Sequence, residues 1–221
     1  MTDLAPAVVL FDLDDTLYPR AAGVMNRIHE LMDDWIVRHL GLDREASTAL
    51  RHRLYLQYGT SMAGLRAEHG IDADDFLRHV HDFDAREYLA PNPRLAAALR
   101  RIPLRRVVFT NGTAEHAGRI LDALGIASLF ERIIDVVDVG YVSKPAPIAY
   151  TRALAILGVD APACIMVEDS PRNLAPARDL GMITVLVGDE SHAVADYHIH
   201  DIIEVADVVN EILARPTRAQ G

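Results

Sequence analysis

Three carboxylates that could do chemistry together stand near the start of the chain, directly after a short apolar run. Asp12, Asp14 and Asp15 follow residues 8–11, whose sequence is Val-Val-Leu-Phe. Side chains two residues apart just past a strand can turn toward one pocket, so we expect Asp12 and Asp14 to share a small volume. Like charges that close are tolerable only when a cation neutralises them or one carboxyl keeps its proton. Both conditions suit phosphoryl transfer, although three such acids would also suit a solvated loop or a helix cap.

A second polar cluster, Thr110-Asn111-Gly112, lies between an apolar run and a predicted helix. A hydroxyl and free backbone N–H groups at a helix start can bind an anion, and Gly112 lets the backbone approach a phosphate closely. An ordinary strand-to-helix turn would contain the same residue types. The cluster is therefore a candidate phosphate site.

Lys144 is the single lysine of the chain, and arginine supplies every other cationic side chain. A compact ammonium in a loop after a strand can hold both an attacking carboxylate and a phosphoryl oxygen. A solitary surface lysine is the alternative interpretation. The scarcity of lysine and the position of Lys144 favour a role in the site.

Two adjacent acids, Glu168 and Asp169, follow the most apolar run of the chain, residues 165–167. Ser170 as N-cap and Pro171 at the first helical position are expected to fix the turn that carries them. With Asp12 and Asp14 these acids would repel one another strongly without a cation. Magnesium prefers oxygen ligands, so Asp12, Asp14 and Asp169 are candidate Mg²⁺ ligands.

The polar clusters can act together only if strands and helices bring them to one edge of a sheet. The apolar runs predict strands at 8–11, 107–110, 133–135, 164–168 and 183–187, with a possible edge strand at 197–199. Helical patterns alternate with them at 94–102, 114–124, 147–157, 171–180 and 202–214. This alternation predicts an α/β fold with a doubly wound parallel sheet, in which polar residues after each strand meet at the same edge.

Residues 20–88 have a different character, with apolar residues at helical spacing almost throughout. Helices are predicted at 25–40, 43–57, 61–69 and 73–83. Four helices between two strands exceed a simple crossover, so we interpret 20–88 as an inserted helical module. Residues 1–19 and 89–221 are then predicted to form the core domain.

Composition excludes some classes of protein. The chain has 221 residues, half of them apolar, and a net charge of −10, which argues against a nucleic-acid polymer as partner. It has no apolar run of 18 residues and no signal-like start, so we expect neither a membrane partner nor export. The single cysteine, Cys164, is predicted to be a buried core residue, as fits a reducing cytoplasm.

Taken together, the motifs resemble those of the haloacid dehalogenase superfamily of phosphatases. The matching residues are Asp12-x-Asp14-x-Thr16, Thr110-Asn111, Lys144 and Glu168-Asp169, in that order along nearly the whole chain. The resemblance implies a Rossmann-like core, with a helical cap inserted between the first and second motifs.

The resemblance also implies a role for each matched residue. Asp12 would be the nucleophile, and Asp14 would protonate the leaving oxygen and then activate water. Thr110, Asn111 and Lys144 would hold the phosphoryl group. Asp169, helped by Glu168, would complete a magnesium site to which Asp14 contributes its backbone carbonyl.

Within that superfamily, residues 11–19 and the cap segments Tyr58-Gly59-Thr60-Ser61 and His81-Asp82-Phe83 look like the pyrimidine 5′-nucleotidase branch. Tyr18 could then stack on a base, and Tyr58, Thr60 and Ser61 could offer polar groups from the cap. The alternative is that Tyr18 packs at a hinge and that Tyr58-Gly59 simply ends a helix.

The sequence thus predicts a Mg²⁺-dependent phosphatase that hydrolyses a pyrimidine nucleoside monophosphate through an aspartyl-phosphate. Sugar phosphates and phosphoglycolate are alternative substrates, and a phosphomutase is an alternative activity. A regulatory phosphate-binding protein without turnover is the alternative from another class, and dehalogenation is disfavoured because it has no use for an acid at Asp14. We expect a small phosphorylated metabolite as partner and a monomer or homodimer.

Overall fold

The computed structural model describes residues 5–215 and contains a parallel sheet of six strands. They are β1 (Val8–Phe11), β2 (Arg105–Phe109), β3 (Arg132–Ile134), β4 (Cys164–Glu168), β5 (Ile183–Val187) and β6 (Tyr197–Ile199). Their order is β3-β2-β1-β4-β5-β6, and each neighbouring pair is parallel. The predicted doubly wound parallel α/β fold is therefore confirmed, with β6 at the edge.

Side chains alternate between the two faces of the sheet, and both faces are buried. Val9 and Phe11 of β1 belong to one apolar cluster, whereas Val8 and Leu10 belong to another. The first face is covered by α5 (Pro93–Arg100), α6 (Ala114–Ala123) and α9 (Val205–Ala214), and the second by α7 (Pro147–Leu157) and α8 (Pro171–Asp179). Burial on both faces explains why these strands read as continuous apolar runs.

The sheet order brings the polar clusters to one place. The chain leaves β1 toward β2 and β3 on one side and returns through β4 on the other, so a switch point lies beside β1. Asp12 follows β1 and donates its backbone N–H to Val167 of β4 at 2.9 Å. Thr110 follows β2, and Glu168 ends β4. Because the strands are parallel, all three residues lie at the same edge of the sheet.

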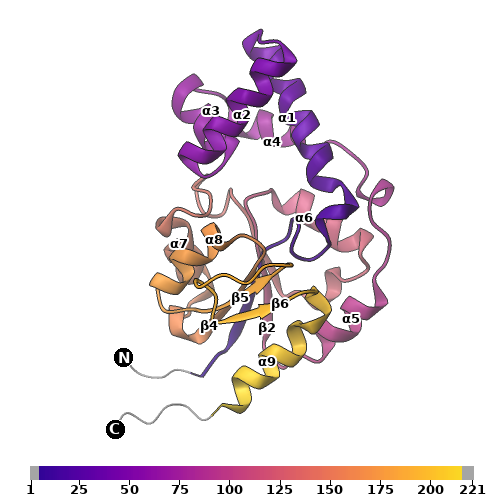
Figure 1. Cartoon of the computed structure of the whole chain (residues 1–221), viewed down its shortest axis with the longest axis vertical. Helices are drawn as coiled ribbons and strands as arrows, with labels where there is room; N and C mark the ends of the chain where they lie inside the picture. The colour runs from indigo at the N-terminus through magenta and orange to yellow at the C-terminus, as the bar shows by residue number, and fades with distance from the viewer. Residues whose placement is uncertain (1–4, 216–221) are drawn as a thin grey trace.

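Four helices form a separate layer beyond that edge. They are α1 (Val24–Leu40), α2 (Arg44–Tyr58), α3 (Ser61–His69) and α4 (Ala73–Val80), drawn in indigo to purple at the top of Figure 1. The short 3₁₀ turns Arg20–Ala22 and Ala85–Glu87 lie where the chain enters and leaves this cap. The exact domain limits at 19/20 and 88/89 stay a prediction, and the outer ends of the predicted core, 1–4 and 216–221, lie outside the described residues.

The last cap helix is shorter than predicted. It ends at Val80 rather than at residue 83, and His81 has φ −103° and ψ 7°. The chain turns there because the His81 ring packs into the core domain, against His116. Within residues 5–215, no helix combines the length and the apolar character needed to cross a membrane.

A buried carboxylate joins the first two cap helices. Asp33 of α1 is 6% exposed and accepts hydrogen bonds from Arg51 Nε at 3.0 Å, Ser47 Oγ at 3.2 Å and Thr48 Oγ1 at 2.9 Å, all from α2. Neighbouring helices α2 and α3 approach closely at Gly64, where a Cβ would lie 2.7 Å from Leu54 Cβ. The packing of α1 on α2 thus depends on the Asp33–Arg51 ion pair. The packing of α3 on α2 depends on the absence of a side chain at Gly64.

Replacing Asp33 with Ala should destabilise the cap, because Arg51 loses its buried partner and two hydroxyls lose an acceptor. We expect the free energy of unfolding to fall by about 2–3 kcal/mol in a urea titration. Asp34→Ala is the matched control, since Asp34 forms an exposed ion pair with Arg44 and its loss should cost under about 1 kcal/mol. Equal losses in the two variants would contradict a structural role for the Asp33 network.

Candidate active site

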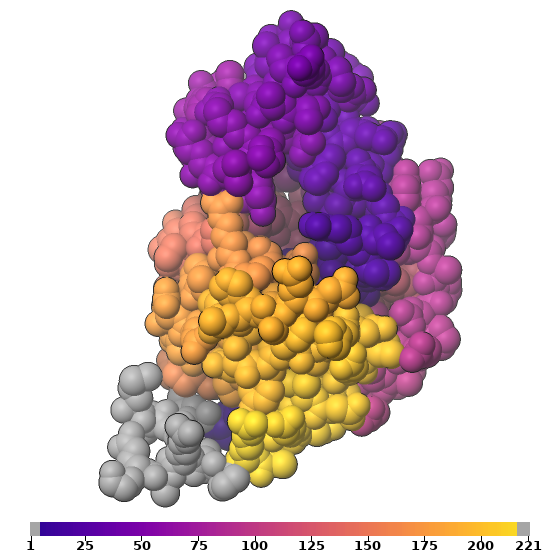
Figure 2. Space-filling model, in the orientation of Figure 1, coloured from indigo at the N-terminus to yellow at the C-terminus, as the bar shows by residue number. Residues whose placement is uncertain are grey.

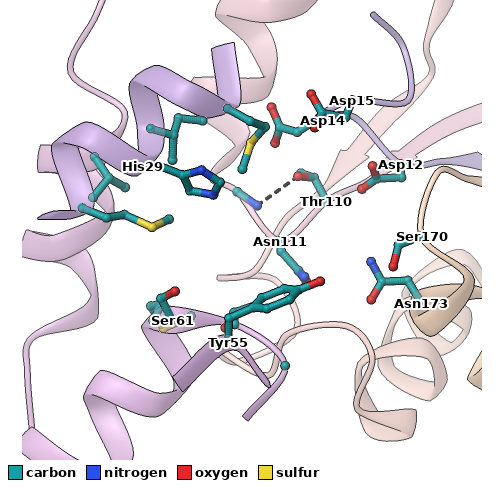
Figure 3. Close-up of a pocket in the computed structure, with 18 of the residues that line it drawn as sticks. Asp12, Asp14, Asp15, His29, Tyr55, Ser61, Thr110, Asn111, Ser170 and Asn173 are labelled. Carbon is teal, nitrogen blue, oxygen red and sulfur yellow. Dashed lines mark hydrogen bonds between the residues drawn. The ribbon is translucent and has the colours of Figure 1, made fainter. Parts of the chain in front are cut away.

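A cavity of about 680 Å³ lies between the sheet edge and the cap. Figure 2 shows the hollow between the cap atoms and the orange atoms of the core. Its lining from the core includes the predicted residues Asp12, Asp14, Thr110 and Asn111, and Figure 3 shows them converging from separate segments of the chain. The cavity is thus walled by both domains.

The ammonium of Lys144 lies at the base of the site, between two carboxylates. Its Nζ is 2.7 Å from Asp12 Oδ1 and 2.8 Å from Glu168 Oε2, and the lysine is 1% exposed. Burial favours the neutral amine, but the two neighbouring charges outweigh burial and raise the pKa of Lys144. The lysine is therefore a permanent positive charge beside Asp12.

Thr16 holds the other oxygen of Asp12. Its hydroxyl donates to Asp12 Oδ2 at 3.0 Å and accepts the backbone N–H of Asp169 at 3.1 Å. Thr16 follows β1 and Asp169 follows β4, so this hydroxyl joins two strand ends. Both oxygens of Asp12 are thereby oriented before any substrate binds.

The carboxylates of Asp12, Glu168 and Asp169 form a cluster that fits a divalent cation. Each offers an oxygen within 4.8 Å of the others. Burial raises the pKa of Asp12 and of Glu168 to about 7 and that of Asp169 to about 6, and charge repulsion among the acids adds to each shift. One lysine cannot neutralise three carboxylates, so this donor set suits a hard cation such as Mg²⁺.

The three acids differ in how free they are to bind an ion. Glu168 is engaged at both oxygens, by Lys144 and by the backbone N–H of Ser170 at 3.3 Å. Both oxygens of Asp12 are engaged as well, by Lys144 and Thr16. Asp169, which among the described residues has only a 3.4 Å contact from the Thr16 hydroxyl, is therefore the acid that is freest to bind an ion. The carboxylate of Asp14, which the sequence grouped with the metal ligands, is not part of this cluster.

Asp14 instead has a set of partners of its own. Its Oδ1 accepts from Tyr18 Oη at 2.5 Å and lies 3.0 Å from His116 Nε2. Burial alone would raise the pKa of Asp14, but the His116 ring and the Tyr18 hydroxyl outweigh it and hold that pKa below its ordinary value. The two carboxylates predicted to share a pocket thus face one cavity from different electrostatic surroundings.

The Thr110-Asn111-Gly112 cluster is divided in its contacts. Thr110 Oγ1 accepts the backbone N–H of Gly112 at 2.9 Å, as the dashed line in Figure 3 marks. The Asn111 amide donates to the Lys144 carbonyl at 3.0 Å, and its oxygen accepts the Lys144 N–H at 2.7 Å. Asn111 therefore fixes the backbone of Lys144, while the hydroxyl of Thr110 remains at the cavity wall.

Two tyrosines predicted to contact substrate lie elsewhere. Tyr18 is 2% exposed and outside the cavity lining, because its ring is packed in the core and its hydroxyl bonds Asp14. Tyr58 is also outside the lining and lies beside Glu68, since it is on the outer side of α2. Thr60 and Ser61 do line the cavity from the cap. The prediction that Tyr18 and Tyr58 contact substrate is therefore not supported by their positions, because neither side chain lines the cavity.

Several site residues escaped the sequence prediction. Tyr55, His29 and Arg51 line the cavity from the cap, and His116 reaches Asp14 from α6. Figure 3 shows the His29 ring directed into the cavity and the Tyr55 hydroxyl pointing toward Ser170 and Asn173. His116 could have been suspected, because it lies in the first turn after the Thr113 N-cap, where a helix following β2 starts at the sheet edge.

A capped parallel α/β sheet with clustered carboxylates and a buried lysine at the end of its central strand defines a class of capped hydrolase. A model of the haloacid dehalogenase-like hydrolase family matches residues 6–181. The chain therefore belongs to the haloacid dehalogenase-like hydrolases, as its motifs predict.

Individual relatives are distant. Phosphate metabolism protein 8 of Saccharomyces cerevisiae is 27% identical over 88% of this chain, and the chain spans 64% of that protein. A phosphoglycolate phosphatase of Rhodospirillum rubrum is 29% identical, with 82% of this chain and 79% of the relative covered. An L-2-haloacid dehalogenase structure from Xanthobacter autotrophicus has a TM-score of 0.60 at 17% identity, covering 93% of this chain and 98% of that one. The last likeness shows the fold.

Replacing Asp169 with Asn should stabilise the protein when metal is removed, because it relieves repulsion in the acid cluster. A carboxyl whose pKa is raised in the folded state makes the folded protein less stable as the pH rises toward that pKa, which is about 6 for Asp169. The melting temperature of Asp169→Asn in chelator should therefore exceed that of the unmodified chain at about pH 8. The gap should narrow as the pH falls below about 6 and close near pH 4, around the ordinary pKa of an aspartate. Thermal unfolding measures both values.

The same variant tests cation binding. Adding Mg²⁺ should raise the melting temperature of the unmodified chain by several degrees and leave Asp169→Asn nearly unchanged, because a ligand of the folded state stabilises it. An equal response of both proteins would show that Asp169 does not hold the ion. The exposed Asp189 offers a control, Asp189→Asn, which should respond to Mg²⁺ as the unmodified chain does.

Proposed function

We propose that the protein is a phosphatase that hydrolyses a small phosphate monoester through an aspartyl-phosphate. The observation that carries the proposal is that Asp12 and Asp14, from one strand end, face one cavity with different partners. Lys144 neutralises Asp12, whereas His116 and Tyr18 bond Asp14. Carboxylates in such contrasting surroundings can take the separate roles of nucleophile and acid-base group.

The reaction has two steps. Asp14 is ionised in the free protein, so it first takes the proton of the substrate, which binds as a phosphate monoanion. In the first step, an oxygen of Asp12 then forms a bond to phosphorus, the bond from phosphorus to the leaving oxygen breaks, and Asp14 gives that oxygen the proton. In the second, Asp14 takes a proton from water, the water oxygen bonds to phosphorus, and the bond to Asp12 breaks. Asp14 returns its proton to the phosphate product, so the sum consumes one water and restores both acids. Positioning and charge neutralisation supply most of the rate.

The phosphoryl group would be held by Lys144 and Thr110, with Asn111 keeping the lysine backbone in place. Mg²⁺ is the cofactor that we propose, held by the carboxylates of Asp12 and Asp169 and by the backbone carbonyl of Asp14. When bound, the ion supplies neutralisation of the transferring group and of the acids around it. Glu168 acts through its ion pair with Lys144.

We propose a pyrimidine nucleoside 5′-monophosphate as the first substrate. The cap wall has an apolar strip, Met25, Ile28 and Met32, and a polar strip, Arg51 and His52. A nucleobase offers an apolar face and a polar edge, which suits such a wall. A cavity of about 680 Å³ has room for a nucleoside, whereas a glycolate group would fill little of it.

Phosphoglycolate or a sugar phosphate remains the second candidate, supported by the relative from R. rubrum whose name states that activity. A phosphomutase would return the phosphoryl group to a sugar instead of to water. We further propose a monomer or homodimer that works in the cytoplasm on a small metabolite, not on a nucleic-acid polymer or a membrane. The net charge of −10 and the buried free thiol of Cys164 support this assignment.

Phosphate release from a panel of monophosphates tests the proposal. We expect UMP, CMP and dTMP to be hydrolysed faster than AMP, phosphoglycolate and sugar phosphates, and chelator to abolish the release. Asp12→Asn should lose more than about a thousandfold in kcat, because it removes the nucleophile. Acid quenching of the unmodified enzyme should trap a phosphoryl group on the peptide that contains Asp12.

Other outcomes of the panel decide between the alternatives. Faster release from glycolate or a sugar phosphate would keep the roles of Asp12 and Asp14 and replace the substrate. Transfer of the group to a sugar would indicate a mutase. No turnover of any compound would favour the regulatory phosphate-binding protein, and full activity of Asp12→Asn would exclude the nucleophile assignment.

Arg51 provides a test of the substrate-binding wall. Within residues 5–215, Nε is the one guanidinium nitrogen of Arg51 with a hydrogen bond, to Asp33, so the terminal nitrogens are free for a base carbonyl. Arg51→Lys keeps a cation for Asp33 and removes the free guanidinium nitrogens. It should raise the KM for UMP about tenfold with little change in kcat, and leave p-nitrophenyl phosphate unaffected. Arg53→Lys is the control, because Arg53 pairs with Glu68 outside the cavity. Equal effects on both substrates would contradict base recognition.

A further inference from the structure

The hydrogen bonds on Asp14 use its two oxygens unequally. Oδ1 faces both His116 Nε2 and the hydroxyl of Tyr18. A carboxyl oxygen that already accepts from Tyr18 fits the tautomer of His116 that carries its hydrogen on Nε2 and donates to Oδ1. Among the residues that the structure describes, none bonds Oδ2, and the Asp14 side chain keeps 19% of its exposure at the cavity. One oxygen is thus fixed, and the other has no partner among the described residues, on a side chain that lines the cavity.

The ring of His116 has little freedom to move. It is 1% exposed and stacks on His81, with ring centroids 4.2 Å apart and planes 10° from parallel. The ring of Phe83 also packs beside the His116 ring, with centroids 5.9 Å apart. A Cβ at residue 112 would lie 3.1 Å from His116 Cδ2, so Gly112 leaves the space that the ring occupies. Packing therefore sets the direction of the Nε2–H bond.

His81 is itself tied to the core domain, although it follows the last cap helix. Its backbone carbonyl accepts from the guanidinium of Arg119 on α6 at 2.6 Å. Its Nδ1 lies 3.4 Å from the hydroxyl of Thr113, which caps the same helix. The stacked pair is thus held from the chain segment that leaves the cap and from the helix that follows β2.

We propose that His116 and Tyr18 are positioning residues for Asp14. By fixing Oδ1, they assign the transferred proton to Oδ2, which gives it to the leaving oxygen in the first step and takes one from water in the second. The inference rests on the proposed phosphatase activity. It explains why a histidine and a tyrosine outside the four motifs are buried against a catalytic carboxylate, and why residue 112 lacks a side chain.

The test compares two substrates that differ in their need for an acid. An alkyl monoester such as UMP must have its leaving oxygen protonated, whereas p-nitrophenolate leaves as an anion. In single-turnover experiments, His116→Ala should slow formation of the phosphoenzyme from UMP about a hundredfold and from p-nitrophenyl phosphate less than about threefold. Because the variant is slow to activate water, a burst of nitrophenolate should precede its steady state.

Two further variants separate positioning from folding. Tyr18→Phe keeps the packed ring and removes one donor, so it should show the same substrate difference at about tenfold. His116→Gln can place an N–H near the position of Nε2 and should restore part of the rate with UMP. The exposed His200 gives the control His200→Gln, which should behave as the unmodified chain.

Equal losses with both substrates in His116→Ala and Tyr18→Phe would overturn the inference, because they would indicate damage to phosphate binding or to the fold. The inference would also be overturned if Tyr18→Phe and His116→Gln turned over both UMP and p-nitrophenyl phosphate at the rates of the unmodified chain. Failure of the proposed function is distinguishable, because the unmodified chain would then hydrolyse neither substrate.

Discussion

The structure depends on the burial of several carboxylates and one ammonium at the carboxyl end of a parallel sheet. Asp12, Glu168 and Asp169 repel one another, and Lys144 offsets part of that repulsion from below. This repulsion is tolerated because parallel strands bring their ends to one place. There the side-chain amide of Asn111 fixes the backbone of Lys144, and the hydroxyl of Thr16 holds the carboxylate of Asp12. Because one lysine does not balance three carboxylates, the site suits a cation such as Mg²⁺ together with the phosphate group of a substrate.

The cap contributes the other wall of the cavity. Its wall toward the cavity combines methionine side chains with the guanidinium of Arg51, which Asp33 holds from behind. Closing such a wall over a substrate removes water from the acids and strengthens every charge interaction among them. The cap helices would therefore have two roles. They shape the space for the leaving group, and they lower the polarity around the transferred phosphoryl group.

The strands, the helices and the four motifs could be predicted from the sequence, because burial on both faces and helix caps act locally. Residues at strand ends, such as Asp12 and Glu168, follow directly from that pattern. The directions of Tyr18 and Tyr58 could not be predicted, since a ring that faces the core and one that faces a pocket have the same sequence signature. His116 was missed for a related reason: its partners Asp14 and His81 are distant in the chain, and only the packed fold brings them together.

The burial of Lys144 has a consequence beyond the site. It is the single lysine of the chain, and it is 1% exposed. The folded protein therefore presents no lysine amine at its surface, so acetylation, ubiquitin attachment and amine-directed cross-linking at lysine are blocked while the fold persists. Reaction of that amine with a labelling reagent would instead report the opening of the site, which makes the residue that organises the charges also an internal reporter of unfolding.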